Sequence, residues 1–134
     1  MFISRKAKSA HIALGKRGEQ LARAYLYAKN IEPLLQNYQT KRGEIDIIAR
    51  DGDEICFIEV KTRRYTTRSR PSEGLSEAQK MRISQAANSY LYAINNPAVI
   101  YRFDLIEIIM GRWDILELYY WREYFHANEF RHRK

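Results

Sequence analysis

The centre of the chain carries the pattern of a β-hairpin, and this pattern constrains the fold more than any other feature. Residues 44–50 and 54–61 are rich in isoleucine and valine and lie on either side of Asp51-Gly52-Asp53. Asp-Gly between two such runs is a strong short-range hairpin signal, because glycine tolerates the positive φ angle of a tight turn. We therefore predict two adjacent antiparallel strands in the middle of the sequence.

Helical patterns lie on both sides of this hairpin. Between residues 9 and 30, apolar side chains recur at three- and four-residue steps, as in an amphipathic helix. A second helix is predicted to open at Ser76, because Gln79 three residues later completes a capping box, and to end before Pro97. The remaining predictions are two strands at 99–109 and 115–120, a connector with an optional short extended piece at 36–43, and a basic loop at 62–74. This order predicts an α/β fold with a mixed central sheet flanked by helices.

Length and composition predict one domain in a reducing compartment. The 134 residues suit a single domain, 1–134, with an aromatic and basic C-terminal extension at 113–134. Cys56 is the only cysteine, so no intrachain disulfide forms, and we expect it in the core. The longest apolar run, 90–94, is too short to cross a membrane, and the charged N-terminus has no signal-peptide core. We expect a cytoplasmic protein with no membrane contact.

The net charge of +7 is distributed in blocks along the chain. Residues 1–30 hold seven basic and one acidic residue, and residues 61–99 hold seven and two. Between them, residues 31–60 hold three basic residues and seven acidic ones. If these blocks fold together, a small acidic pocket lies within a positive surface, which attracts a polyanion such as nucleic acid. The alternative is that lysines and arginines only solvate helix faces.

Three charged residues of the hairpin are candidates for chemistry. Glu59 and Lys61 project from one face, because side chains alternate along a strand. Asp46 joins them in either of two hairpin registers, as a diagonal neighbour of Glu59 at about 7 Å or directly opposite it at about 5 Å. An odd-length loop or a bulge would separate them. Glu44 shares the face of Asp46 and is a lower-ranked candidate.

Two close carboxylates repel each other unless a cation or a lysine compensates. Hard oxygen ligands at this spacing suit Mg²⁺ or Mn²⁺, which bridge acidic side chains and a phosphate. Lys61 could then orient the attacking water or stabilise the charge that develops on the phosphate. The alternative interpretation of this Asp-Glu-Lys set is an ion-pair ladder on the hairpin surface.

The hairpin and its surroundings resemble a known group of nucleases. Asp46 followed by Glu59-Val60-Lys61 resembles the D-x(n)-E-x-K signature of the restriction-endonuclease-like superfamily. From about Gly15 to Ile108, the chain is more closely similar to the YraN family, small bacterial predicted endonucleases related to Holliday-junction resolvases. The residues that carry this similarity are Gly15-Lys16-Arg17-Gly18-Glu19, Ala22, Tyr25-Leu26, 43–52, 57–63, Lys80, Ala87, Tyr90-Leu91 and Arg102-Phe103-Asp104.

The resemblance implies a restriction-endonuclease-like core of αβββαβ type and a role for several residues. It implies that Asp46, Glu59 and the backbone carbonyl of Val60 bind the metal and that Lys61 is the catalytic lysine. Glu19 matches a helix carboxylate that approaches the metal or its water. Basic residues expected at the phosphate backbone are Lys16, Arg17, Arg63, Arg64, Arg68 and Lys80, the last beside a helix N-terminus.

Two functions from different classes follow. The first is a divalent-metal-dependent endonuclease that hydrolyses DNA, with selectivity for junctions or branches left open. The second is a non-catalytic nucleic-acid-binding or assembly module with the same fold. The aromatic residues of 113–134 could stack on unpaired bases, but packing on the sheet or a homodimer contact is the favoured use.

Overall fold

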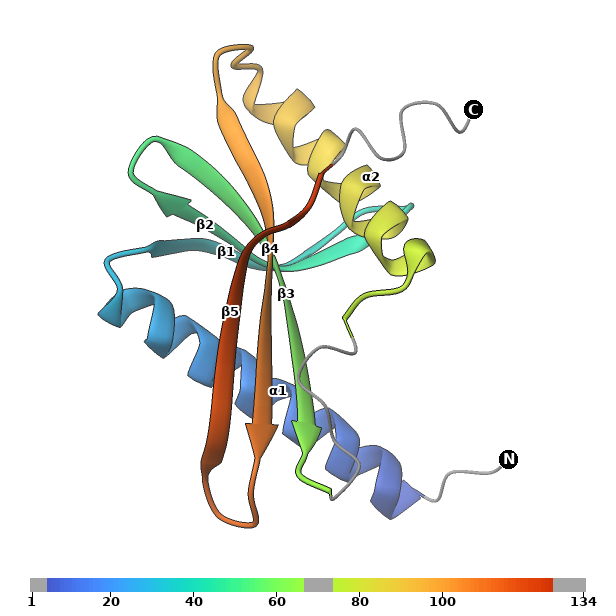
Figure 1. Ribbon diagram of the computed structural model, residues 1–134. Helices are drawn as coiled ribbons and strands as arrows, with labels where there is room; N and C mark the ends of the chain where they lie inside the picture. The colour runs from blue at the N-terminus through green and yellow to red at the C-terminus, as the bar shows by residue number, and fades with distance from the viewer. Residues whose placement is uncertain (1–4, 67–73, 127–134) are drawn as a thin grey trace.

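The computed structural model describes residues 5–66 and 74–126, with only the backbone described for residues 5–7. Two helices and five strands make up the fold (Figure 1). Their bounds are α1 Arg5–Ala28, β1 Glu32–Gln39, β2 Glu44–Asp51, β3 Glu54–Arg64, α2 Glu77–Ile94, β4 Ile100–Met110 and β5 Ile115–Phe125.

The strands form one mixed sheet in the order β1-β2-β3-β4-β5. Neighbouring strands are antiparallel except for β3 and β4, which run parallel. Parallel neighbours require a crossover, and α2 provides it. The α/β class and the mixed sheet flanked by helices are confirmed. Compared with the order predicted from the sequence, β1 is added before the hairpin, and compared with the αβββαβ core that the resemblance implies, β5 is added at one edge.

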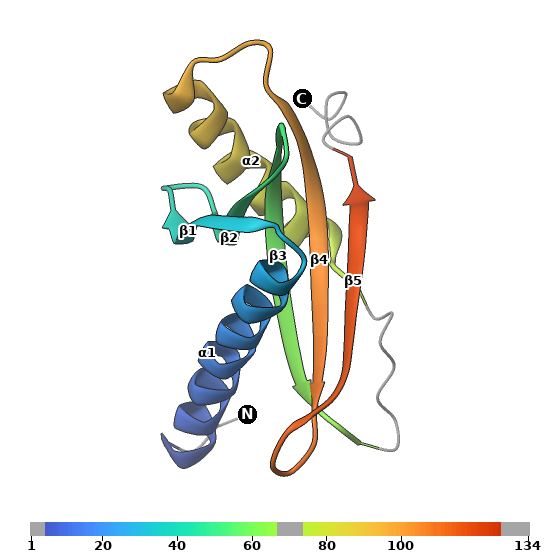
Figure 2. The same ribbon diagram turned by 90° about the vertical axis from the view of Figure 1, so that its left-hand side faces the viewer.

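The two helices cover opposite faces of the sheet (Figure 2). On one face, Ala22 and Leu26 of α1 pack on Cys56 and Ile58 of β3. On the other face, residues of α2 such as Ile83 and Ala87 pack on Phe57 and Phe103 among others. Cys56 is fully buried, as expected. The central strand β3 is therefore buried on both faces over its first half.

Strand β2 departs from regular alternation at Asp46. Ile45 packs in the core on the α2 side, whereas Ile47, two residues later, packs on the α1 side. Residues two apart in a regular strand share a face, so the strand twists sharply at Asp46. The pairing of β2 with β3 also stops here, at Ile47 opposite Ile58.

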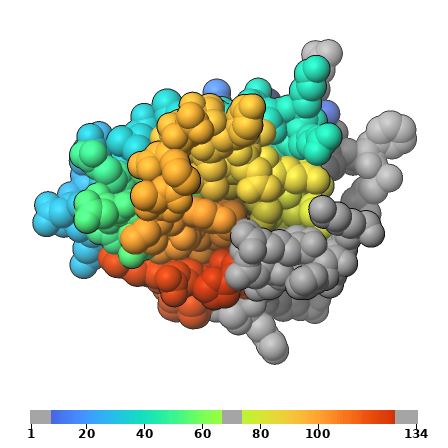
Figure 3. All heavy atoms as spheres, turned by 90° about the horizontal axis from the view of Figure 1, so that it is seen from above, coloured from blue at the N-terminus to red at the C-terminus, as the bar shows by residue number. Residues whose placement is uncertain are grey.

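The turn between β1 and β2 reaches across to α2. A Cβ atom on Gly43 would lie 2.1 Å from the backbone oxygen of Arg82, so only glycine fits at this contact. Figure 3 shows the turn against α2 at one end of the molecule. This contact brings α2 close to the residues that follow Gly43.

Several element boundaries differ from the prediction. Helix α1 begins at Arg5, before the predicted residue 9. Residues 62–64, expected in a basic loop, are the last residues of β3, because they pair with Ile108–Met110 of β4. The connector at 36–43 contains the second half of β1, residues 36–39, and the first half of this strand precedes it. The last predicted strand extends to Phe125, so much of the segment 113–134 is the edge strand of the sheet. The N-cap of α2 is the predicted capping box of Ser76 and Gln79.

The helices of the described segments include none that is long and apolar enough to cross a membrane.

Candidate functional site

The hairpin register places Asp46 and Glu59 close together. Strands β2 and β3 pair Asp51 with Glu54 and Ile47 with Ile58. This register agrees with the closer of the two arrangements considered from the sequence, although the pairing ends at Ile47 and does not include Asp46. The side chains of Asp46 and Glu59 nevertheless meet, because they share a hydrogen bond. Glu59 follows Phe57 on the α2 side of β3, where alternation directs its side chain.

Asp46 also contacts the backbone of β3. Its Oδ2 accepts a hydrogen bond of 2.8 Å from the N–H of Val60. This N–H lies just beyond the last β2–β3 pair, so the carboxylate replaces the missing strand partner. Because the N–H and C=O of a strand residue point to the same edge, the carbonyl of Val60 faces the side on which Asp46 lies.

Four carboxylates gather around this point. Burial raises the pKa of Glu59 well above its usual range, and a hydrogen bond to Asp46 and the negative charges of Asp46, Glu44 and Glu19 raise it further. The pKa of Glu19 is also raised, first by burial and then by the charge of Asp46, against an opposing effect of Arg23. Arg23 opposes only the shift of Glu19, and the causes of the Glu59 shift include no cation. Without a bound cation, Glu59 therefore retains a proton at neutral pH.

Lys61 does not neutralise this cluster. Its Nζ donates a hydrogen bond of 2.6 Å to the backbone oxygen of Gly74, at the entrance to α2. The lysine shares the face of Glu59, as strand alternation predicts, and lies beside Glu107 of β4. Its amine is therefore held near the carboxylates but is hydrogen-bonded to the backbone.

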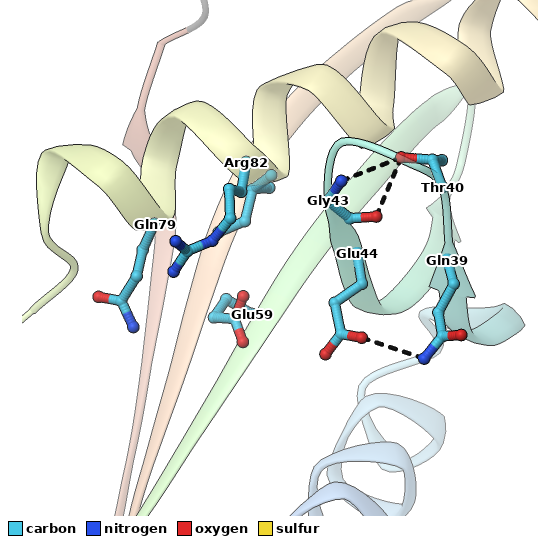
Figure 4. A pocket seen from close by; sticks show the side chains of 8 residues that line it. Gln39, Thr40, Gly43, Glu44, Glu59, Gln79 and Arg82 are labelled. Atoms are coloured by element: carbon cyan, nitrogen blue, oxygen red, sulfur yellow. Dashed lines mark hydrogen bonds between the residues drawn. The ribbon is translucent and has the colours of Figure 1, made fainter.

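A hollow of about 470 Å³ opens beside Glu59 (Figure 4). Its lining comes from the β1–β2 turn, from β3 and from the first turns of α2: Gln39, Thr40, Gly43, Glu44, Glu59, Gln79, Arg82 and Ile83. In Figure 4, Arg82 and Gln79 extend from α2 toward Glu59. Glu44 lies across the hollow, where it accepts a hydrogen bond of 3.2 Å from Gln39.

Arg82 is a residue that the sequence analysis missed. It is exposed, and no acidic side chain within 5–66 and 74–126 forms an ion pair with it. Its position on the second predicted helix, two residues after Lys80, was visible in the sequence. The packing of the β1–β2 turn on α2, which places Arg82 opposite Glu44, could not be seen in the sequence.

The predicted basic residues are spread over two regions. Lys16 and Arg17 are exposed on α1, and Arg64 is exposed at the end of β3. Arg63 is mostly buried, with its Nη2 3.8 Å from Oε2 of Glu107. Lys80 lies 3.5 Å from Glu77 and over the rings of Tyr124 and Phe125, and Arg68 lies outside the described residues.

The donor set fits a small, hard cation. Within the described ranges, no three His, Cys, Asp or Glu side chains are grouped so that they could hold a metal ion. Mg²⁺ needs no such cage, because it is usually bound by one or two carboxylates, with water and substrate phosphate as further ligands. Asp46 and Glu59, with the carbonyl of Val60 at the same edge, match this smaller set.

The fold and site define a small α/β protein with an acidic cluster at the centre of a mixed sheet. The family model described as "Uncharacterised protein family UPF0102" matches residues 18–108. The chain belongs to this family, which is the YraN family whose motifs it resembles.

Individual relatives of the chain carry the same family name. A UPF0102 protein of Chlorobaculum parvum is 43% identical over 101 residues, which are 75% of this chain and 78% of the relative. A UPF0102 protein of Clostridium kluyveri is 40% identical over 101 residues, with 75% and 83% covered. One from Syntrophus aciditrophicus is 42% identical over 98 residues, with 73% and 77% covered.

Proposed function

We propose that this protein is a divalent-metal-dependent endonuclease with a restriction-endonuclease-like fold that hydrolyses phosphodiester bonds in DNA. The observation that carries the proposal is the contact between Asp46 and Glu59 next to an open hollow, where Glu59 must keep a proton unless a cation binds. A buried pair of carboxylates that shares a hydrogen bond is costly for the folded chain. A site that binds a cation with its substrate offsets that cost.

Asp46, Glu59 and the carbonyl of Val60 would hold Mg²⁺ or Mn²⁺. When bound, the ion supplies a Lewis acid for the phosphate and lowers the pKa of water. The hydrogen bond from Val60 N–H fixes Oδ2 of Asp46, and the ion would replace the hydrogen bond that Glu59 shares with this carboxylate. Glu19 lies behind Asp46 and holds it by a hydrogen bond.

The hollow would receive the scissile phosphate. Arg82 extends into it opposite Glu44, and a guanidinium group binds phosphate through two parallel hydrogen bonds. Lys61 is the candidate for stabilising the charge that develops during hydrolysis. To reach the phosphate, its amine must exchange the carbonyl of Gly74 for the substrate.

The hydrogen bond between Lys61 and Gly74 is also the observation that favours the second candidate function. In a non-catalytic nucleic-acid-binding or assembly module, this lysine would be a structural link between β3 and α2. Such a module binds DNA with the same affinity with and without Mg²⁺ and cuts no substrate.

Cleavage assays separate the two candidates. Linear, single-stranded, flapped and four-way-junction DNAs are incubated with the protein in MnCl₂, in MgCl₂ and in EDTA. We expect that at least one of these DNAs is cleaved and that its cleavage requires the metal. Glu59→Gln should lower the cleavage rate by at least about a thousandfold and should retain DNA binding. Glu32→Gln, at a surface carboxylate paired with Arg50, is the matched control and should cut normally. Cleavage that persists in EDTA, or in Glu59→Gln, would contradict the proposal.

A further inference from the structure

The turn between β4 and β5 lies at the same end of the sheet as the end of β3 and projects beyond it (Figures 1 and 2). A hollow of about 430 Å³ lies at this end. It is lined by Arg64, Tyr65, Met110, Gly111, Arg112 and Leu116. Its lining combines two arginines with apolar and aromatic side chains and contains no carboxylate.

Large apolar side chains are unusually exposed around this hollow. Trp113 at the tip of the turn is 87% exposed, and Tyr65 and Leu116 are 58% and 55% exposed. The guanidinium of Arg112 lies 5.3 Å from the centre of the Trp113 ring. Trp113 therefore does not pack on the sheet, which was one part of the favoured expectation from the sequence. The other part, contact with a second copy, stays a prediction for this residue.

The backbone at this end is held in place. Gly111 N–H donates to the oxygen of Asp114 at 2.7 Å, and the Asp114 side chain accepts from the N–H of Ile115 at 2.7 Å. Tyr65 N–H donates to the oxygen of Met110 at 2.8 Å, which continues the pairing of β3 with β4. The backbone that carries Trp113 and Tyr65 is therefore held by hydrogen bonds.

We propose that this hollow and Trp113 bind an unpaired stretch of nucleic acid, with bases against the Trp113 and Tyr65 rings and phosphates at Arg64 and Arg112. Sites for single strands combine positive charge with aromatic rings, because every base offers a flat face for stacking. Protein interfaces also use tryptophan, tyrosine and arginine, and the oligomeric state measured below separates contact with a second copy from binding of nucleic acid. The inference rests on the proposed nucleic-acid substrate, although not on cleavage.

The position of the hollow connects it to the carboxylate site. Arg64 follows Lys61 by three residues on β3, about 10 Å along an extended strand, and this odd spacing turns its side chain to the other face of the sheet. A strand that reaches both sites must therefore pass around the end of β3, over at least the length of about three stacked nucleotides. The site therefore selects substrates in which a strand becomes unpaired a few nucleotides from the bond that is cut, as at a flap or a branch.

Binding is measured by fluorescence anisotropy in EDTA, where no metal-dependent cleavage occurs. The probes are a labelled 15-nucleotide oligo-dT and a blunt 15-base-pair duplex. We expect Trp113→Ala to weaken oligo-dT binding about tenfold and duplex binding less than twofold. Tyr92→Ala is the matched control, because Tyr92 is 88% exposed on α2, away from this hollow, and should leave both affinities unchanged.

A second readout reports contact directly. The chain has two tryptophans, so Trp121→Phe leaves Trp113 as the only one, and oligo-dT should quench its fluorescence. An effect of Trp113→Ala below twofold on oligo-dT, an equal loss on duplex, or a dimer that Trp113→Ala converts to monomer in sedimentation would overturn the inference. Quenching by oligo-dT without cleavage of any DNA would uphold it and contradict the nuclease instead.

Discussion

Glu59 lowers the stability of the metal-free protein at high pH, and it is also a proposed metal ligand. Because its pKa is raised, the folded protein binds a proton there that the unfolded chain has already released above its ordinary pKa. Its contribution is therefore most favourable at low pH and is lost as pH rises toward the folded pKa. A cation at the site has the opposite dependence, since it binds the ionised carboxylate.

We predict that Glu59→Gln stabilises the metal-free protein at pH 8 by at least about 1.4 kcal/mol, the equivalent of one pKa unit. The melting temperature of the wild type should fall between pH 5 and pH 8 relative to that of Glu59→Gln. MgCl₂ should raise the wild-type melting temperature more at pH 8 than at pH 5. If the two proteins have parallel profiles, Glu59 is an ordinary surface carboxylate.

A second prediction concerns the close contact of Gly43 with α2. A Cβ at this position meets the Arg82 backbone oxygen at 2.1 Å, so Gly43→Ala must push the β1–β2 turn away from α2. We expect a loss of about 2 kcal/mol in urea unfolding. Gly15→Ala is the control, because no atom lies within 4 Å of the added Cβ in α1, and alanine favours a helix by about 0.5–1 kcal/mol. Equal effects would contradict the close contact.

Among the elements, those with strong local signals were predictable from the sequence. The hairpin of β2 and β3, the capping box of α2 and the periodic helix α1 follow from turn chemistry and side-chain spacing. Strand β1 was not predicted as a full strand, because most of its residues are polar and exposed and its partner β2 decides its conformation. The end of β3 was missed for a similar reason, since pairing with β4 keeps basic residues extended.

The same distinction applies to the site. The shared face of Glu59 and Lys61 could be predicted, because alternation along a strand is local. The departure of β2 from alternation at Asp46 could not. The hairpin register, the partner of Lys61 and the position of Arg82 depend on contacts between elements that are distant in sequence. These features could not be obtained from residue patterns alone.

Strand β4 is fixed to the hairpin by a buried arginine. Arg102 is 8% exposed and contacts Asp104 at 3.1 Å, Glu54 at 2.9 Å and Asp51 at 3.0 Å. Tyr120 of β5 donates a hydrogen bond to Asp104. The arginine therefore ties the turn of the β2–β3 hairpin to the parallel strand beside it, which is the longest-range pairing in the sheet to form.

We predict that Arg102→Ala lowers the free energy of unfolding by about 3–5 kcal/mol, because it removes the cation paired with the buried Asp104 carboxylate. Arg122→Ala is the control, since Arg122 also pairs with Asp51, at 3.2 Å, but is 53% exposed. It should cost less than about 1 kcal/mol. Urea denaturation measures both, and equal losses would show that the Arg102 network adds nothing specific.

At the scale of the whole molecule, the sheet places opposite charges in separate regions. Three acidic residues of the block 31–60, namely Glu44, Asp46 and Glu59, form the carboxylate cluster together with Glu19. Lys16 and Arg17 are exposed on α1, and Arg64 is exposed at the end of β3. Net charge alone indicates only that the partner is anionic. The folded arrangement indicates where a phosphate backbone meets cations and where a bridging metal is needed.

We predict that Lys16→Ala with Arg17→Ala weakens DNA binding and lowers the slope of log Kd against log salt by about 1.8, or about 0.9 for each lost phosphate contact. Lys29→Ala, in the turn after α1 and beside the Tyr25 ring, is the control and should leave the slope unchanged. A salt dependence that is the same in all three proteins would place the DNA on another face.

The most direct test of the carboxylate site is the anomalous scattering of manganese in a crystal of the protein soaked in MnCl₂. We predict one strong peak within about 2.5 Å of oxygen atoms of both Asp46 and Glu59, with the carbonyl of Val60 as a further ligand. The peak should be absent from crystals of Glu59→Gln. A wild-type crystal with no peak between these two carboxylates, or with manganese bound only elsewhere, would contradict the divalent-metal site.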